Sequence, residues 1–201
     1  RGGATVMAQM TVAAAIGHQE ADHWTHHLQD TIKSGQELCN ENLSYLLCKN
    51  APEKILQMRD WKTDWANDNA RIRQVLAPGH GVKRCCYVDF LNTGPAVART
   101  LRGEVAKLKN VTRVSGLTII DLVIDENRVI GAIGLNTESG EYVSISTTAI
   151  VLAAGGLTQL FARNSASKNM GGDSHALALR AGANLIDMEF VQFFPIGHLA
   201  P

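Results

Sequence analysis

The spacing of apolar and polar residues predicts a helical first third of the chain. Four helices are expected before residue 61, at residues 4–16, 20–33, 37–48 and 52–60. The first is rich in small apolar residues and is expected to be buried, ending at Gly17. The polar stretch over residues 61–81 is interrupted by Pro78-Gly79 and predicts a surface loop.

From Arg84 onwards, alternating apolar and polar residues become frequent, and this period is typical of strands. A short strand over residues 85–90 and a helix over residues 96–108 are expected first. Three alternating segments joined by turn sequences then predict an antiparallel β-meander. These segments are residues 117–124, 128–135 and 141–146.

A continuous apolar run over residues 148–154 predicts a strand buried on both faces, because both of its sides are apolar. It ends at Gly155-Gly156, and a helix over residues 172–181 follows. An extended aromatic segment over residues 184–194 closes the pattern. The mixture predicts an α/β fold with α+β features.

Composition narrows the class of protein. The chain has 201 residues, 45% of them hydrophobic and 19% charged, which is typical of a globular domain with one sizeable core. Its net charge is zero, so nothing indicates nucleic-acid binding, and no apolar run is long enough for direct membrane insertion. No CxxC pair occurs, which argues against a zinc site and favours reduced thiols at all four cysteines: Cys39, Cys48, Cys85 and Cys86.

Two glycine-containing turns in the second half are candidate ligand sites. Gly155 and Gly156 end the predicted strand without side chains, so a nucleotide or another backbone can approach closely, although an ordinary tight turn has the same sequence. Asp173 is expected to be the N-cap of the following helix, whose free N–H groups can bind an anion or a polar cofactor edge. Simple helix capping is the alternative there.

Other candidate residues carry weaker signals. Gly2-Gly3 precedes the first predicted helix, but it is equally compatible with a segment boundary without function. His23 and His27 have the i, i+4 spacing of metal ligands, yet no HExxH pattern accompanies them, and a structural helix face is favoured. Lys83-Arg84 is expected to be a solvated pair, and Cys85-Cys86 to lie in a buried strand.

The order of these segments resembles the succinate dehydrogenase/fumarate reductase flavoprotein family along essentially the whole chain. The resemblance is carried by six segments: Thr5-Val6-Met7-Ala8-Gln9, residues 22–35, Arg84-Cys85-Cys86 with Thr93-Gly94, Ala153-Ala154-Gly155-Gly156 with Gly172-Asp173, Arg180-Ala181-Gly182-Ala183, and Glu189-Phe190-Val191-Gln192-Phe193.

The resemblance implies a Rossmann-like FAD-binding domain over residues 1–194, with the β-meander as an insertion over residues 117–147. The family's GxGxxG strand and loop would lie upstream of Arg1, and residues 195–201 would begin a connection to a capping domain. The implied FAD-binding residues are Gly2, Gly3, Ala4, Thr5, Ala8, Gln9, Met10, Ala154, Gly155, Gly156 and Asp173.

Three departures from the family pattern change what is expected. Ala4 stands where membrane-bound members have the histidine that bonds covalently to flavin, so FAD is expected to be held non-covalently. Lys83 replaces a usual histidine. Phe194 and Ile196 replace the His and Thr of the family's dicarboxylate-binding sequence, and neither side chain can replace their hydrogen bonds. The implied substrate-binding residues are Gln192, Phe194 and, as a substitute donor, His198.

The implied function is an FAD-dependent oxidoreductase that transfers a hydride between flavin and the C–C bond of a dicarboxylate. The family's proton-donating arginine would lie beyond Pro201, so no catalytic residue is expected in this chain, and the isolated chain is expected to be inactive. The resemblance also implies a carboxylate substrate, an iron–sulfur partner subunit, and a cytoplasmic location at the inner face of the membrane through partner subunits. The alternatives are an amino-acid oxidase, another enoate reductase, or a non-catalytic flavin- or nucleotide-binding module.

Overall fold

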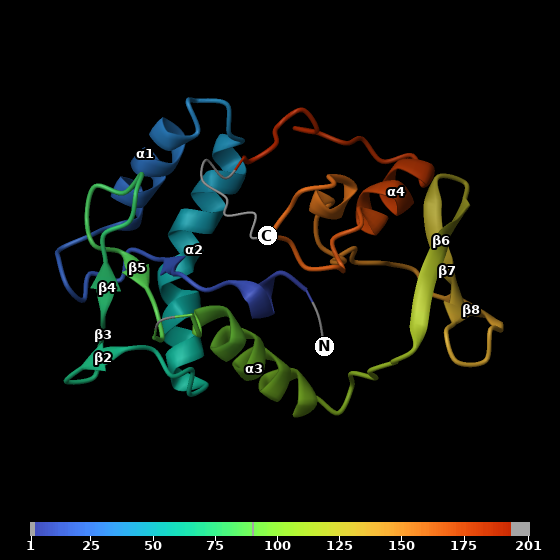
Figure 1. The fold of residues 1–201 in the computed structure, drawn as a ribbon, viewed down its shortest axis with the longest axis horizontal. Helices are drawn as coiled ribbons and strands as arrows, with labels where there is room; N and C mark the ends of the chain where they lie inside the picture. The colour runs from blue at the N-terminus through green and yellow to red at the C-terminus, as the bar shows by residue number, and fades with distance from the viewer. Residues whose placement is uncertain (1–2, 90, 194–201) are drawn as a thin grey trace, which may run out of the picture. The chain divides into compact units, whose positions relative to one another are not determined.

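A computed structural model describes residues 3–89 and 91–193. The chain forms two compact units, unit 1 over Arg1–Thr112 and unit 2 over Arg113–Pro201 (Figure 1). Unit 1 contains three helices, one 3₁₀ turn and five two-residue strands among its described residues: η1 (Thr5–Met7), β1 (Val12–Ala13), α1 (Trp24–Ser34), α2 (Glu41–Asp60), β2 (Asn67–Asp68), β3 (Arg71–Ile72), β4 (Gln74–Val75), β5 (Cys85–Cys86) and α3 (Thr93–Ala106).

The core of unit 1 forms where a small antiparallel sheet, in the order β1-β5-β4, meets α2. Ala13 and Val75 both pair with Cys85, so β5 is the central strand. The buried cluster consists of Ala14, Ile55, Trp65, Ile72 and Cys86. Burial of a large apolar side chain contributes about 1.5–3 kcal/mol, and these residues therefore hold the sheet to the helix.

The predicted buried helix over residues 4–16 is not present. The described part of this segment makes the short turn η1 and then the strand β1. The physical reason lies in the contacts of its carbonyl groups. Those of Ala8 and Met10 accept hydrogen bonds from Gly94 and Thr93 of α3. These bonds hold the segment in a non-helical path, in which Ala8 is extended.

Two helix boundaries also differ from the prediction. α1 begins at Trp24 instead of residue 20, because the ring of His23 accepts a hydrogen bond from the Thr25 N–H and caps the helix there. The two helices expected over residues 37–48 and 52–60 are one helix, α2, with Pro52 in its interior. Proline removes one backbone donor, but the helix continues on both sides of it.

Residues 61–81 are more ordered than the predicted surface loop. β2 and β3 form a hairpin, and β4 pairs with β5. Trp65, Ile72 and Gln74 are buried. The Gln74 amide donates to the Ala14 carbonyl at 2.9 Å and accepts from the His18 N–H at 3.1 Å, so this polar side chain completes the sheet. The predicted strand at Cys85 and the helix after it are confirmed, although the strand ends at Cys86 and α3 begins at Thr93.

Unit 2 contains the predicted meander. β6 (Leu117–Asp125), β7 (Arg128–Asn136) and β8 (Tyr142–Ser146) pair antiparallel in that order. Glu126 and Asn127 both have positive φ, at 44° and 62°, as a tight two-residue hairpin turn requires. The 3₁₀ turn η2 (Thr158–Leu160) and the helix α4 (Asp173–Arg180) follow, and Arg180 donates to Asp121 and to the Ile120 carbonyl of β6.

In unit 2 the predicted strand over residues 148–154 is absent, and a turn interrupts the segment after α4 that was predicted to be extended. Residues 148–154 pair with no other strand among the described residues, and Val151 is 90% exposed. A continuous apolar run gives no information on whether a partner strand is present, so the sequence could not settle this point. Residues 184–193 likewise form no strand, since Asp187 has a φ of 58° and accepts a turn hydrogen bond from Phe190.

The described residues contain no helix with the length and apolar character needed to cross a membrane.

Candidate functional site

In unit 2 the Gly155-Gly156 turn lies against the beginning of α4. The Gly172 N–H donates to the Gly156 carbonyl at 3.1 Å, and the Ala154 N–H donates to the Ser174 hydroxyl at 3.0 Å. These two bonds bring together residues that lie far apart in the sequence, since Ser174 comes 20 positions after Ala154. The structure therefore joins Ala154, Gly155 and Gly156 to the start of the helix that Asp173 begins.

The two glycines leave backbone donors available to a ligand. Gly155 has a φ of 84°, which favours glycine, and a side chain on Gly156 would press on the Met170 methyl group at 3.0 Å. Among the described residues, no group accepts a hydrogen bond from the N–H of Gly155 or Gly156. Free N–H groups beside a helix N-terminus suit a phosphate or a polar cofactor edge, so the turn fits a nucleotide.

Asp173 is not the N-cap that the sequence predicted. Gly172 holds that position in the left-handed conformation, with a φ of 87°, and Asp173 is the first residue of α4. Its carboxylate is exposed and makes no capping hydrogen bond. An acidic group at the positive end of a helix is stabilised by the helix dipole and can accept hydrogen bonds from ligand hydroxyl groups.

An apolar groove of about 460 Å³ runs beside this turn within unit 2. Residues 150–154 form one wall, and the remaining lining comes from the meander, Thr147 and α4: Ile119, Leu122, Ala132, Ile145, Thr147 and Leu177. The apolar run that was predicted to be a buried strand is thus the exposed wall of a groove.

In unit 1 the candidate residues Ala4, Thr5, Ala8, Gln9 and Met10 all have exposed side chains. The neighbouring Met7 is 51% exposed and Met10 is 71% exposed. Hydrogen bonds from α3 fix the backbone of this segment, while its apolar side chains face outward. An anchored backbone with exposed apolar groups fits an aromatic ring system as ligand.

Three predicted site residues, Gly2, Phe194 and His198, lie outside the described residues. Gln192 is described and is exposed, and Gly3 has a φ of 104°.

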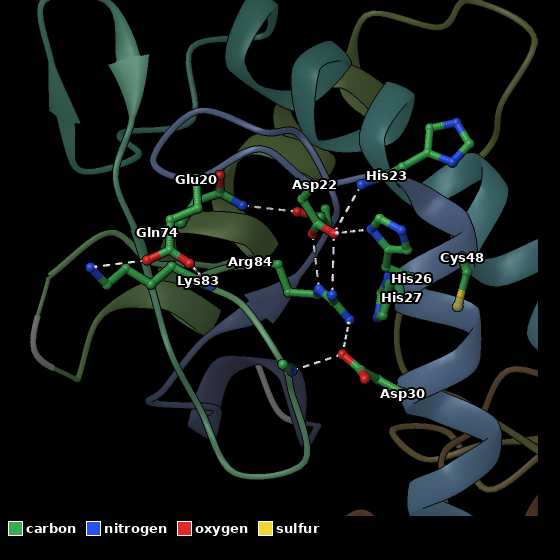
Figure 2. Close-up of polar contacts among 12 residues, drawn as sticks. Glu20, Asp22, His23, His26, His27, Asp30, Cys48, Gln74, Lys83 and Arg84 are labelled. Carbon is green, nitrogen blue, oxygen red and sulfur yellow. Dashed lines mark hydrogen bonds and ion pairs between the residues drawn. The ribbon is translucent and has the colours of Figure 1, made fainter.

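A buried ion-pair cluster in unit 1 was not expected from the sequence (Figure 2). The side chain of Arg84 is only 1% exposed, so its predicted place in a solvated pair is wrong. It donates to both oxygens of Asp22, at 3.0 and 3.2 Å, and to Asp30 at 2.7 Å. Lys83 is exposed and pairs with Glu20 at 3.2 Å. The acidic partners of Arg84 lie 62 and 54 positions away, so no local pattern indicates the burial.

The charges of this cluster act on neighbouring groups. Burial alone would raise the pKa of Asp30, but the Gly81 N–H and the Arg84 guanidinium outweigh it and lower that pKa. His27 and His80 lie with ring centroids 5.7 Å apart, and burial followed by the charge of Arg84 lowers the pKa of both. The Nδ1 atoms of both rings are buried and find no hydrogen-bond partner among the described residues. The cluster therefore keeps two imidazoles neutral around a fixed charge.

His23 and His27 were expected to share a structural helix face, with metal binding as the less favoured alternative, but only His27 lies within a helix. His23 caps α1 from outside the helix, and His27 is buried within it. No group of three or more His, Cys, Asp or Glu side chains within the described ranges is placed to hold a metal ion.

Comparison with known proteins finds a family model and several similar proteins. A family model described as FAD binding domain matches residues 1–201. A succinate dehydrogenase flavoprotein subunit of Rickettsia bellii is 31% identical, over 96% of the chain and 34% of that protein. An L-aspartate oxidase 2 of Ralstonia nicotianae is 31% identical, over 90% of the chain and 34% of that protein.

A solved structure, the Sdh1 complex of Mycobacterium smegmatis in the apo form, aligns with a TM-score of 0.85. It is 30% identical to the chain and covers 89% of it, while the chain covers 32% of that protein. The expected fold class is confirmed by this likeness. The chain spans about a third of the length of the curated relatives it matches.

Proposed function

Because the chain belongs to the FAD binding domain family, we propose that it is the flavin-binding part of an oxidoreductase acting on a carboxylate-containing substrate. FAD is the cofactor of this family, and when bound it supplies the hydride chemistry. The chain's own residues bind and orient the cofactor. The observation that carries the proposal is the Gly155-Gly156 turn, whose free N–H groups lie beside the N-terminus of α4.

The residues of unit 2 are proposed to bind polar parts of FAD. The N–H groups of Gly155 and Gly156 donate to a phosphate or to a polar edge, and Gly155 leaves room for close approach because it has no side chain. Asp173 accepts hydrogen bonds from cofactor hydroxyl groups, because a carboxylate would repel a phosphate.

The residues of unit 1 are proposed to contact the flavin through the segment that begins at Gly3. Ala4 has no ring nitrogen, so it cannot form the covalent bond that a histidine makes. FAD is therefore held non-covalently, by the backbone and exposed side chains of Thr5, Ala8, Gln9 and Met10.

The proposed reaction is hydride transfer between FAD and the C–C bond of a dicarboxylate, as between succinate and fumarate. Gln192 is proposed to contact the substrate, with Phe194 and His198 nearby in the sequence. Phe194 cannot donate a hydrogen bond to a carboxylate. The loss of a charge-assisted donor costs about 1.5–3 kcal/mol of binding, so dicarboxylates are expected to bind more weakly than in enzymes with histidine there.

Two other functions are the alternatives to this proposal. The similarity to an L-aspartate oxidase favours an amino-acid substrate as the second candidate, and Phe194 with Ile196 is compatible with it. A non-catalytic flavin-binding module is the third candidate.

Because the Rickettsia relative is named a flavoprotein subunit, we propose an iron–sulfur partner subunit and, through it, a location at the inner face of the membrane.

Steady-state assays of the full-length protein separate these functions. Fumarate with a reduced dye, succinate with an oxidised dye, and L-aspartate with oxygen or an oxidised dye are the substrates to compare. Turnover of fumarate or succinate supports the proposal, and turnover of L-aspartate alone supports the oxidase. Bound flavin that none of the three substrates reduces or oxidises supports the non-catalytic module.

A substitution sharpens the substrate assignment. Phe194→His restores a donor, and we expect it to lower the KM for fumarate or succinate by about tenfold, as a gain near 1.4 kcal/mol would. Phe193→His is the matched control, because it adds the same ring at the adjacent position. Equal effects of both variants would contradict a substrate contact at position 194.

A further inference from the structure

The N-terminus of α3 is bound to the segment that is proposed to contact flavin. Thr93 is 2% exposed, and its hydroxyl donates to the Met10 carbonyl at 2.8 Å. The same oxygen accepts the Val88 N–H at 3.2 Å. The Thr93 hydroxyl is therefore both a donor and an acceptor, and its two hydrogen bonds link Met10 to the residues that lead into α3.

Gly94 makes a second link to the same segment. Its N–H donates to the Ala8 carbonyl at 2.8 Å. The first N–H groups of a helix have no partner within the helix, and Asn92, the N-cap of α3, makes no side-chain capping bond. The Ala8 carbonyl thus replaces part of a cap, although it belongs to a distant part of the sequence.

Position 94 also has no room for a side chain. A methyl group there would overlap the carbonyl oxygens of Thr5 and Ala8 and would press on the Ala8 side chain. Two of these neighbours are backbone atoms, so a larger residue would have to move the segment itself. Glycine is required at this position because the helix and the segment lie in direct backbone contact.

From these contacts we propose that Thr93 and Gly94 are positioning residues that hold residues 5–10 in the geometry that binds flavin. This inference rests on the proposed function. The side chains of Met7 and Met10 are exposed, so little apolar burial fixes the segment. Its geometry therefore depends on the backbone hydrogen bonds to α3. Flexible ligand-binding segments lose affinity, because binding must then order them.

Four variants of the full-length protein test the proposal. Thr93→Val keeps the shape but removes the hydroxyl, Thr93→Ser restores it, and Gly94→Ala displaces the segment. Thr100→Val is the matched control on the same helix, because the Thr100 hydroxyl accepts a hydrogen bond from Thr63 at 2.9 Å, away from residues 5–10. The measurements are the FAD dissociation constant, the visible spectrum and reduction potential of bound flavin, and the unfolding midpoint of the apoprotein.

The expected result is a loss of FAD affinity of about tenfold in Thr93→Val, near-normal affinity in Thr93→Ser, and a larger loss in Gly94→Ala. The flavin spectrum and potential should shift in Thr93→Val and Gly94→Ala. Thr100→Val should lower only the apoprotein midpoint. If Gly94→Ala does not fold, the comparison of Thr93→Val with Thr93→Ser still tests the positioning role of the Thr93 hydroxyl.

Different negative results would overturn the positioning role of Thr93 and Gly94 alone, or that role together with the proposed function. Wild-type affinity, spectrum and potential in Thr93→Val overturn the positioning role and leave the proposed function intact. Equal losses of affinity in Thr93→Val and Thr100→Val, in proportion to lost stability, also overturn it, because they indicate a general structural effect. A wild-type protein that binds no FAD overturns the proposed function and the positioning role together.

Discussion

Arg84 donates two hydrogen bonds to Asp22, at 3.0 and 3.2 Å, and neither side chain is more than 1% exposed. A third bond joins the same guanidinium to Asp30 of α1. The arginine immediately precedes β5, so this charge cluster connects the central strand of the small sheet to α1 and to the segment before it. It therefore adds a buried polar link between these elements to the apolar core of unit 1.

Removal of the arginine should strongly destabilise unit 1. Arg84→Met leaves two carboxylates without their cation, one of them fully buried, and the expected loss is about 3–5 kcal/mol of unfolding free energy. Chemical denaturation at neutral pH measures it. Lys83→Met is the control, since its ion pair with Glu20 is exposed and should matter little. Similar small losses in the two variants would show that the buried ion pairs contribute little to the stability of unit 1.

Acid should destabilise unit 1 in a window that begins near pH 6.5. The pKa values of His27 and His80 are lowered in the folded state by burial and by Arg84, although Asp22 and Asp30 act in the opposite direction. The unfolded chain therefore binds protons first. Stability is complete above the ordinary pKa of 6.5 and is lost as the pH falls below it. Unfolding midpoints between pH 7.5 and 5.5 measure the slope.

His27→Leu should flatten this slope, because it removes one of the imidazoles that must stay neutral. A slope that His27→Leu leaves unchanged would assign the acid sensitivity to other groups.

The sequence predicted those parts of the fold that depend on neighbouring residues. The meander followed from alternation and from the turn at Glu126-Asn127, both of which are local signals. The segment at residues 4–16 was mistaken for a helix because its partner Thr93 lies 83 positions from Met10. Neither the composition of the segment nor its hydrophobic periodicity shows which distant residue it will contact.

The candidate site was predicted only in part for the same reason. Gly155 and Gly156 were found because paired glycines after an apolar run are a local pattern. Asp173 was found, but its role as N-cap was wrong, because the N-cap position has the left-handed geometry that favours Gly172. The contact between Gly156 and Gly172 became visible only in the structure.

Thiol reagents should modify the cysteines in the order of their accessibility. Burial raises the pKa of Cys85, and it raises the pKa of Cys86 to about 12. Thiolates are the reactive form, so both should remain unmodified at pH 8 while the partly exposed Cys39 reacts. Peptide mapping after brief alkylation, native against denatured, identifies the sites. Early labelling of Cys85 or Cys86 in the native protein would contradict their burial.

Two glycine-to-alanine changes should have opposite effects. Gly103 lies within α3, and a methyl group added there would meet nothing within 4 Å apart from the neighbouring backbone of its own helix, so Gly103→Ala should stabilise the protein by up to about 1 kcal/mol. Gly172 has a φ of 87°, and a methyl group there would press on Leu157 at 3.1 Å, so Gly172→Ala should destabilise it by about 1–2 kcal/mol. Thermal unfolding of each variant checks the signs, and a stabilising Gly172→Ala would contradict the geometry at the start of α4.

The central claim is that the chain binds FAD and, because Ala4 offers no nucleophile, binds it non-covalently. Acid precipitation of the purified full-length holoprotein tests it most directly, with the flavin in pellet and supernatant measured by absorbance and identified by chromatography. We expect intact FAD in the supernatant, near one equivalent per protein chain, and a colourless pellet. Flavin that remains with the pellet, or a protein from which no flavin is released, would contradict the claim.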